Sequence, residues 1–437
     1  MLDPTGAMMG PEAIVERRKK YGLPCTAHFY SNPPHIVRGS MQYLYDQEGR
    51  RYVDFFTGVS VVACGHCNEA ITERTVEQLR RLQHTSTIYL TQPMVELAER
   101  LADVLPGAVR RTFFCNSGSE ANEGALLAAR LHTGRRNFLA LEYGLHGRTF
   151  LTMNVTGIPM WRADDWLDSD TATFIPRPWC DGLEPNAAAR RSLEALAAVL
   201  ADKGETFAAM IVEPIQGNGG IIKPPDWYYR ELKKMLEAHG ILLIADEIQT
   251  GMGRTGRMFA MEHYEVTPDI ITMAKALGNG VPIGAFSMTD EIAASYNRPS
   301  ASTFGGNPVS SATALAVLDY IERHGLVDQA MVLGERLMNG LCIVQKKYPD
   351  IVAEVRGKGL MVGAELKGCG ERTDAEMTDT VLERMKDRGY IIGKNGVKRN
   401  VLAFQPAMII SADDIDGMLG ALDGVLADVS AESYQSL

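Results

Sequence analysis

Residues 227–247 read WYYRELKKMLEAHGILLIADE and predict both a helix and a strand. The first two thirds of the stretch has apolar residues at helical spacing and ends at Gly240, a residue type that commonly follows a last helical turn. The run 241–245 is apolar without a break and ends at Asp246. A strand without a polar face is typical of a parallel sheet that helices cover on both sides. The stretch therefore predicts one helix–strand unit of such a sheet.

The same alternation extends in both directions along the chain. Apolar runs at 111–115, 207–212 and 270–274 alternate with helical patterns, which predicts an α/β fold with a mostly parallel sheet covered by helices. After about residue 330 the pattern changes to a long helix, strands within 352–366, another helix and a short strand pair around 390–410. This second pattern indicates a smaller α+β domain.

We predict three parts from these patterns. Residues 1–65 form an N-terminal segment that joins the small domain, residues 66–325 form the large cofactor-binding domain, and residues 326–437 form the C-terminal small domain. Within the first part, the aromatic-rich runs of residues 41–56 predict a hairpin with its turn at 47–49.

The composition excludes several classes of partner. The chain has 437 residues and a formal net charge of -10, which argues against nucleic acid or an anionic membrane as a general partner. No apolar run reaches the ~18 residues of a membrane span. The first 20 residues lack an apolar core preceded by a basic residue, so we expect no secretory signal. The seven scattered cysteines fit free thiols in a reducing compartment, and we predict a cytoplasmic location.

Polar residues follow several of the predicted strands. Lys275 ends the run 270–274, Asp246 and Glu213 end two others, and the small residues 116–119 lie between a strand and a helix. A lysine at a strand end is usually a surface residue when taken alone. In an open parallel sheet, however, ligands bind outside the carboxyl ends of the strands, and a helix N-terminus there favours an anion.

A lysine, an aspartate and an anion site at one sheet edge together indicate pyridoxal 5′-phosphate. Lys275 would form the Schiff base, Asp246 would keep the pyridine nitrogen protonated, and the Ser-Gly-Ser turn at 117–119 would bind the phosphate. Desolvation lowers the pKa of a lysine, which suits an amine that must bond to a carbonyl carbon and later shuttle a proton.

The chain resembles the class III pyridoxal-phosphate aminotransferases, with fold type I, over nearly its whole length. The resemblance is carried by FFCNSGSEANEGALLAAR (113–130), IVEPIQGNGG (211–220), LLIADEIQTGMGRTG (242–256), PDIITMAKALGNGVPIGA (268–285), STFGGNPVSSA (302–312) and VRGKGLMVGAEL (355–366). The subgroup that it resembles is that of alanine–glyoxylate aminotransferase and its lyase relatives, through HTSTIY (84–89) and YLYDQEGRRYVDFFTGV (43–59).

The resemblance implies a homodimer with shared active sites and a set of cofactor contacts. Gln249 would hydrogen-bond the phenolic oxygen of the cofactor, and Thr303 would reach the phosphate from the other subunit. The remaining residues that it implies near the cofactor are Ser117, Gly118, Ser119, Leu145, His146, Glu213, Asp246 and Lys275. The implied activity is ping-pong transfer of an amino group from an amino acid or ω-amine to a small 2-oxo acid.

Two positions depart from the family pattern. Leu145 stands where an aromatic residue normally stacks on the cofactor ring. Either an aliphatic side chain covers that face of the cofactor, or Tyr143 supplies the stacking aromatic ring. Ala403 stands where many members carry an arginine that grips a carboxylate. This absence favours pyruvate or glyoxylate over 2-oxoglutarate as acceptor. Cations that could replace the arginine, each more typical of a solvated surface, are Arg162, Lys394, Lys398 and Arg399.

Other interpretations remain at this point. Cys64 and Cys67 form a C-x-x-C pair, as in thiol–disulfide exchange, but lie in a chain much larger than a thioredoxin-like unit. Residues 251–256 match G-x-G-x-x-G without the adjoining strand and helix that a dinucleotide site needs. Within the cofactor class, the alternatives are a lyase acting on a phosphorylated amine and a 2-oxoglutarate-linked ω-amino acid aminotransferase.

Overall fold

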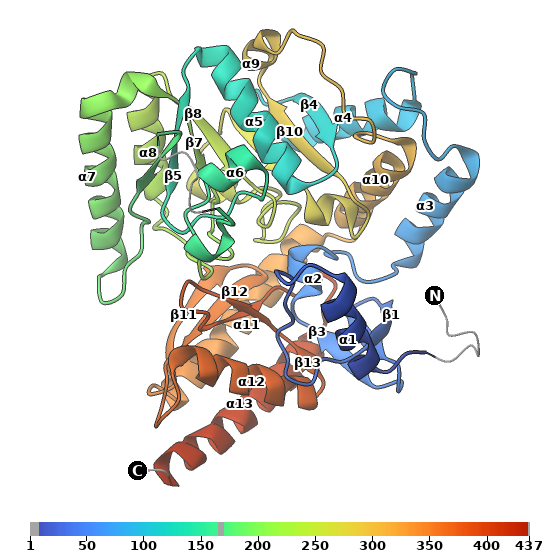
Figure 1. Ribbon diagram of the computed structural model, residues 1–437, viewed down its shortest axis with the longest axis vertical. Helices are drawn as coiled ribbons and strands as arrows, with labels where there is room; N and C mark the ends of the chain where they lie inside the picture. Colours follow the sequence, from blue (N-terminus) through green and yellow to red (C-terminus); the bar gives the residue numbers. More distant parts are fainter. Residues whose placement is uncertain (1–7, 165–169, 436–437) are drawn as a thin grey trace.

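The computed structural model of the chain describes residues 8–164 and 170–435. Residues 1–7, which belong to the stretch predicted to carry no secretory signal, lie outside the described residues. Figure 1 shows two groups of elements: the middle of the chain builds the upper group, and the two ends of the chain meet in the lower group. We call these the large part and the small part.

The large part is built on a seven-stranded sheet. Its strands in spatial order are β4 (Arg111–Cys115), β10 (Gly284–Met288), β9 (Ile270–Met273), β8 (Leu242–Asp246), β7 (Phe207–Val212), β5 (Asn137–Leu141) and β6 (Ala172–Ile175). Only β10 runs antiparallel to its neighbours β4 and β9, and the other pairs are parallel. The predicted mostly parallel sheet is confirmed.

Helices cover both faces of this sheet, which explains its continuous apolar strands. In β8, Leu243 and Ala245 pack in the core that includes α8 (Tyr228–Glu237) and α7 (Pro185–Lys203). Ile244 packs in a second core with α5 (Gly118–Thr133). Because side chains alternate along a strand, Asp246 shares the α5 face with Ile244.

The small part combines the two ends of the chain. One sheet has the order β11 (Val352–Lys358), β12 (Met361–Leu366), β15 (Val401–Phe404) and β14 (Gly393–Asn395). The other has the order β1 (Ile36–Ser40), β2 (Tyr43–Asp46), β3 (Arg51–Asp54) and β13 (Tyr390–Ile391). The antiparallel pair β2–β3 is the predicted hairpin. The pair β3–β13 joins both ends of the chain; the predicted domain boundaries at 65 and 325 stay predictions.

The remaining helices complete the two parts. They are α1 (Pro11–Tyr21), α2 (Thr57–Ser60), α3 (Glu69–Arg81), α4 (Gln92–Val104), α6 (Phe150–Asn154), α9 (Asp290–Ser295), α10 (Pro308–Arg323), α11 (Leu326–Lys347), α12 (Asp374–Asp387) and α13 (Ala412–Gln435). Within the described ranges, no helix combines the length and apolar character that a membrane crossing requires.

Candidate active site

Lys275 lies directly beyond the carboxyl end of β9, at the first residue of the short 3₁₀ turn η4 (Lys275–Gly278). Its φ angle of 46° is in the left-handed region, which is uncommon for a residue other than glycine. Burial lowers the pKa of Lys275 below its usual value, and the carboxylates of Asp246 and Glu213 oppose that shift. A lysine with a lowered pKa has a larger neutral fraction at a given pH, which suits a nucleophilic amine.

Asp246 is held by three hydrogen bonds at the end of β8. Its Oδ2 accepts from Asn122 Nδ2 at 2.8 Å and lies 2.8 Å from His146 Nδ1, and its Oδ1 accepts from the Ile248 backbone N–H at 3.2 Å. Only 4% of Asp246 is exposed. This carboxylate is therefore fixed in position and shielded from water, as a charge partner of a protonated ring nitrogen must be.

Glu213 connects this cluster to the loop after β7. Its two carboxylate oxygens accept from the backbone N–H groups of Leu145 and Gly217, each at 2.9 Å. Burial raises the pKa of Glu213 to about 7, an effect that nearby His146 opposes and Asp246 reinforces. A carboxyl group with a pKa near neutrality is a feature of functional sites.

The turn between β4 and α5 has the features of an anion cradle. Ser117 is the N-cap of α5, and its side chain accepts from the Glu120 N–H. Ser119 Oγ accepts from the Arg148 backbone N–H at 3.1 Å. A Cβ atom at Gly118 would lie 2.7 Å from Ile248 Cδ1, so this position has no room for a side chain. The N–H groups of Gly118 and Ser119, which have no partner within the helix, are therefore the ones available to an anion.

Gln249 faces the same region from the loop after β8. Its Oε1 accepts from Gln405 Nε2 at 3.2 Å, which joins the large part to the small part. A Cβ atom at Gly217 would lie 2.7 Å from the amide group of Gln249, so the two loops are in close contact. Gln249 is 8% exposed, so its side chain is buried between these loops.

These groups fit pyridoxal phosphate. The molecule has an anionic phosphate, a basic ring nitrogen and an aldehyde that reacts with an amine, and the residues offer an anion cradle, a buried carboxylate and a lysine of lowered pKa. The Nε2 atom of His146 is buried and, among the described residues, has no hydrogen-bond partner. An unpaired buried polar atom beside Asp246 is a feature expected of a site built to hold a polar ligand.

The sequence profile of the family named "Aminotransferase class-III" matches residues 27–426. The chain belongs to this family. The predicted membership is thereby confirmed, and the geometry above describes a class III aminotransferase.

Several known proteins are similar to this class III aminotransferase along their whole length. The alanine–glyoxylate aminotransferase 2 homolog 2 of Arabidopsis thaliana is 38% identical over 95% of this chain and 87% of its own. The acetylornithine aminotransferase of Methanocaldococcus jannaschii is 37% identical over 96% of this chain and 100% of its own. The crystal structure of an Arthrobacter phospholyase in complex with phosphoethanolamine is 32% identical, with a TM-score of 0.86, over 95% of this chain and 99% of its own.

The structure brings most of the predicted site residues of this aminotransferase together and leaves one apart. Lys275, Asp246, Glu213 and His146 form one cluster. Thr303 is exposed beside Phe304, whose ring lies tilted against that of His84 with 5.0 Å between the ring centres. Among the described residues, no recorded contact joins Thr303 to this cluster. Its predicted contact with the cofactor phosphate therefore needs a second subunit.

The structure also places the two departures from the family pattern. The ring of Tyr143 lies 4.7 Å from the Arg177 guanidinium and lines a cavity between the two parts, so its ring is already engaged there. Ala403 is fully buried in a small apolar cluster with Phe56, Ile215, Ile221 and Met361. Gln405, just beyond the end of β15, bonds to Gln249, so Ala403 lies two residues before a contact with the site.

Three of the four cations predicted as replacements for the missing arginine contact other groups of the protein, and the fourth, Arg399, is exposed. Lys394 is buried and pairs with Asp379, which corrects the expectation of a solvated surface charge. Its strand partner is Leu402, so it lies on the face of the sheet opposite to Ala403. Lys398 pairs with Asp181 at 3.1 Å, and Arg162 lies 5.7 Å from the Phe174 ring.

Sequence reasoning missed three residues that contact the predicted set. Asn122 bonds Asp246 and could have been found, because it lies one helical turn after Gly118 in α5 and thus on the face that meets the sheet edge. Gln405 gave no such signal, since its contact with Gln249 depends on how the two parts pack. Arg148 is exposed next to the cradle residue Ser119 and is a cation that a substrate could meet.

The C-x-x-C pair lacks the features of a redox site. Cys64 is fully buried and burial raises the pKa of its thiol to about 12, whereas a reactive cysteine needs a lowered pKa. Its backbone N–H donates to Asn279 Oδ1 at 2.9 Å, and Asn279 Nδ2 donates to Gly65 O at 3.0 Å. These bonds tie the turn to the segment after Lys275, which is a structural role.

Replacing Cys64 and Cys67 together with serine should therefore change the transamination rate by less than about tenfold, or ~1.4 kcal/mol on the barrier. The bonds to Asn279 use backbone groups and survive the substitution. Steady-state rates of the holoenzyme and the double variant provide the measurement. A complete loss of activity in a variant that still binds cofactor would restore the redox interpretation.

Proposed function

We propose that the chain is a pyridoxal-phosphate-dependent aminotransferase that moves an amino group from an amino acid or ω-amine to a small 2-oxo acid by ping-pong chemistry. The observation that carries the proposal is the cluster of Lys275, Asp246 and Glu213 beside the α5 N-terminus. Lys275 would bond to the cofactor, Asp246 would pair with its ring nitrogen, and Gln249 would meet its phenolic oxygen. Ser117, Gly118 and Ser119 would bind its phosphate.

When bound, the cofactor supplies an electron sink for the carbon next to the substrate amine. The residues of the chain supply the charge partner of the ring nitrogen and the group that moves the proton. Asp246 stabilises the proton on the ring nitrogen, and His146 and Asn122 fix the orientation of that carboxylate through their hydrogen bonds. The Lys275 amine, with a pKa already lowered by burial, would move the proton of the substrate carbon next to the amine.

A homodimer with shared sites is part of the proposal. Ile88, Tyr89 and Leu90 are 81%, 65% and 99% exposed, and Phe304 is 60% exposed. Exposed apolar side chains that lie close together are typical of an interface. The neighbouring Thr303 is also exposed, so a partner molecule on this surface could bring its own Thr303 to the phosphate cradle.

We also propose a cytoplasmic location, which the seven free cysteines support.

The apolar surroundings of Ala403 support a small acceptor. An arginine at this position would offer two parallel charge-assisted bonds to a second carboxylate, and alanine offers none. Lys394 and Lys398 pair with Asp379 and Asp181 instead. We therefore propose pyruvate or glyoxylate as the preferred acceptor. Should 2-oxoglutarate prove to be preferred, the exposed Arg148 beside the cradle becomes the residue to mutate.

Acceptor profiles test this proposal. With one good amine donor, the wild type should use pyruvate or glyoxylate with a higher kcat/KM than 2-oxoglutarate. Ala403→Arg should shift the ratio toward 2-oxoglutarate by about tenfold, the effect of one charge-assisted pair. Ala403→Met is the matched control, because it fills similar space without a charge. A wild type that strongly prefers 2-oxoglutarate, or an equal shift in both variants, would contradict the proposal.

A lyase acting on a phosphorylated amine is the second candidate function. The similarity to the Arthrobacter phospholyase, whose structure holds phosphoethanolamine, favours it. Both functions use the same cofactor cluster, so the residues do not separate them. Incubation of the holoenzyme with phosphoethanolamine separates them, because a lyase releases phosphate without any 2-oxo acid, whereas an aminotransferase requires the acceptor.

A further inference from the structure

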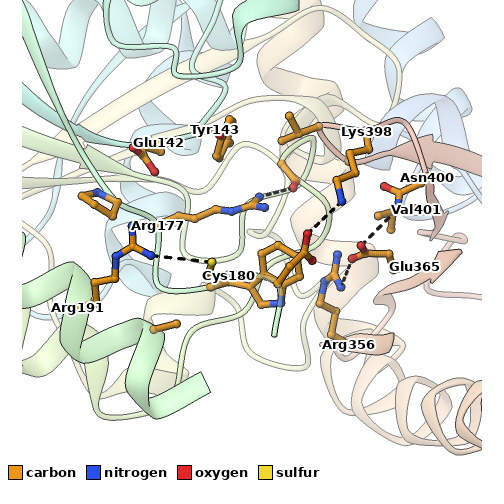
Figure 2. Close-up of a pocket in the computed structure, with 17 residues that line it drawn as sticks. Glu142, Tyr143, Arg177, Cys180, Arg191, Arg356, Glu365, Lys398, Asn400 and Val401 are labelled. Atoms are coloured by element: carbon orange, nitrogen blue, oxygen red, sulfur yellow. Dashed lines mark hydrogen bonds and ion pairs between the residues drawn. The ribbon is translucent and has the colours of Figure 1, made fainter. Parts of the chain in front are cut away.

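A cavity of about 430 Å³ lies between the large part and the small part. Figure 2 shows residues of both parts facing each other across it. Its lining includes Tyr143, Arg177 and Trp179 from the large part and Arg356, Glu365 and Lys398 from the small part. None of the residues proposed to hold the cofactor lines this cavity. It is therefore distinct from the candidate active site, and its size is that of a small-molecule pocket.

Arg177 is the central cation of the cavity. Its guanidinium lies 4.7 Å from the Tyr143 ring centre and 4.4 Å from the Trp179 ring centre, and Nη1 donates to Gly219 O at 2.8 Å. No carboxylate partner of Arg177 occurs among the residues that the structure describes. Rings beside the guanidinium hold it in place and leave N–H donors at its edge free for a ligand.

The other cations deep in the cavity are neutralised within the protein. Arg356 Nη1 pairs with Glu354 at 2.7 Å and with Glu365 at 2.6 Å. Lys398 pairs with Asp181 at 3.1 Å. Arg177 is thus the one of these three cations without an ion-paired carboxylate among the described residues, although Glu365 and Asp181 act on it through space.

The charges around the cavity nearly balance once Glu354, the partner of Arg356 beside the lining, is included. At the rim, Arg191 contacts the Cys180 sulfur at 4.0 Å. The lining has four basic residues, Arg177, Arg191, Arg356 and Lys398, against three acidic ones, Glu142, Asp181 and Glu365. Burial, and after it the nearby Arg356, lower the pKa of Arg177, while Tyr143, Glu365 and Asp181 oppose that shift, so burial is the main cost to its charged form. An anion beside Arg177 would relieve this cost.

We propose that this cavity binds a small organic anion with a carboxylate or phosphate group, and that Arg177 is its principal ligand. A planar guanidinium held by aromatic rings is pre-organised for two parallel bonds to either group. The inference does not depend on the proposed function, because it uses other residues.

Backbone geometry connects the cavity to the active site. Arg177 and Arg356 Nε hold the consecutive carbonyl oxygens of Gly219 and Gly220, the latter at 2.9 Å. These glycines lie in the loop that begins at Glu213. Ile221 has a φ angle of 57°, which is strained for a β-branched residue, and its backbone N–H donates to Gly217 O at 3.1 Å within the same loop. An anion on Arg177 would therefore act on the loop that positions Glu213.

Binding can be measured on the holoenzyme with inorganic phosphate and with citrate as separate probes. The intrinsic tryptophan fluorescence should change saturably with at least one probe, and the two arms show whether phosphate or carboxylate is preferred. Potassium chloride at equal ionic strength should give no such change, which controls for screening. Trp179→Phe should remove the fluorescence signal while the thermal stabilisation by the bound probe persists, because binding to the folded state raises the Tm.

Substitutions then test the role of Arg177. Arg177→Met should weaken binding at least about tenfold, the loss expected for one charge-assisted pair. Arg177→Lys keeps the charge but not the fork, should also weaken binding, and serves as the test if Arg177→Met does not fold. Arg190→Gln removes a neighbouring exposed charge on α7, outside the lining, and should bind as the wild type does. Unchanged affinity in an Arg177 variant, or no saturable binding of either probe, would overturn the proposal.

Discussion

Lys275→Ala should abolish turnover without unfolding the protein. The lysine is proposed both to bond to the cofactor and to move the substrate proton, and alanine does neither. The side chain makes no hydrogen bond to the protein that the structure records, so its loss should cost little stability. Steady-state assays with a good donor–acceptor pair, together with thermal melts, measure the two effects. We expect no detectable rate and a Tm close to that of the wild type.

Borohydride treatment identifies the lysine chemically. Reduction of the holoenzyme should fix the cofactor covalently, and peptide mapping should place it on Lys275. Lys234→Ala is the control, because Lys234 is an exposed residue of α8 that pairs with Glu231. That variant should keep the wild-type rate and the same labelled peptide. A label on any lysine other than Lys275 would remove the assignment on which the proposed mechanism rests.

The pH dependence should follow from the burial of Lys275. Its pKa is lowered, so the neutral amine forms at a lower pH than it does for an exposed lysine. The side chain is thus ready to bond to a carbonyl carbon nearer to neutral pH. Glu213, with a pKa raised to about 7, changes charge near neutral pH. Ionisation of both groups should therefore contribute to the dependence of the rate on pH.

The meeting of Lys275, Asp246 and Glu213 could be predicted because each follows a strand with no polar face. Such strands belong in a parallel sheet, and their carboxyl ends share one edge. That they are close together also depends on strand order, since β9, β8 and β7 are neighbours in the sheet. Asp246 rather than Glu247 faces α5 for a similar reason, since side chains alternate along β8; Glu247 turns away and accepts from the Met261 N–H at 2.9 Å.

Contacts between the two parts could not be predicted in the same way. Gln405 and Gln249 lie 156 positions apart, and nothing in their local sequence indicates that they bond. Lys394 looked like a surface charge because lysine usually is one, but its pairing with Asp379 allows it to be buried. The cavity around Arg177 has the same origin: its walls come from segments whose contact depends on tertiary packing alone.

Asp246→Asn should lower the rate by about 10³-fold while the fold is kept, which corresponds to ~4 kcal/mol on the barrier. A neutral amide cannot stabilise a proton on the cofactor ring nitrogen, so the electron sink weakens. The substitution also disturbs the local network. Asp246 Oδ2 accepts from Asn122 Nδ2 and lies 2.8 Å from His146 Nδ1, and an amide NH₂ group at that oxygen position would face donors instead of accepting from them.

The measurement is the single-turnover half-reaction with a saturating donor, because it isolates the proton transfer from acceptor binding and product release. Asp269→Asn is the matched control: Asp269 also lies at an end of the same sheet, but it accepts from the Leu243 N–H and pairs with Lys233, away from the cofactor residues. That variant should lose some stability and keep its half-reaction rate. A half-reaction in Asp246→Asn close to that of the wild type would show that the ring nitrogen does not depend on this carboxylate. The charge partner would then have to be sought among the neighbours of His146, of which Glu213 is the other buried carboxylate.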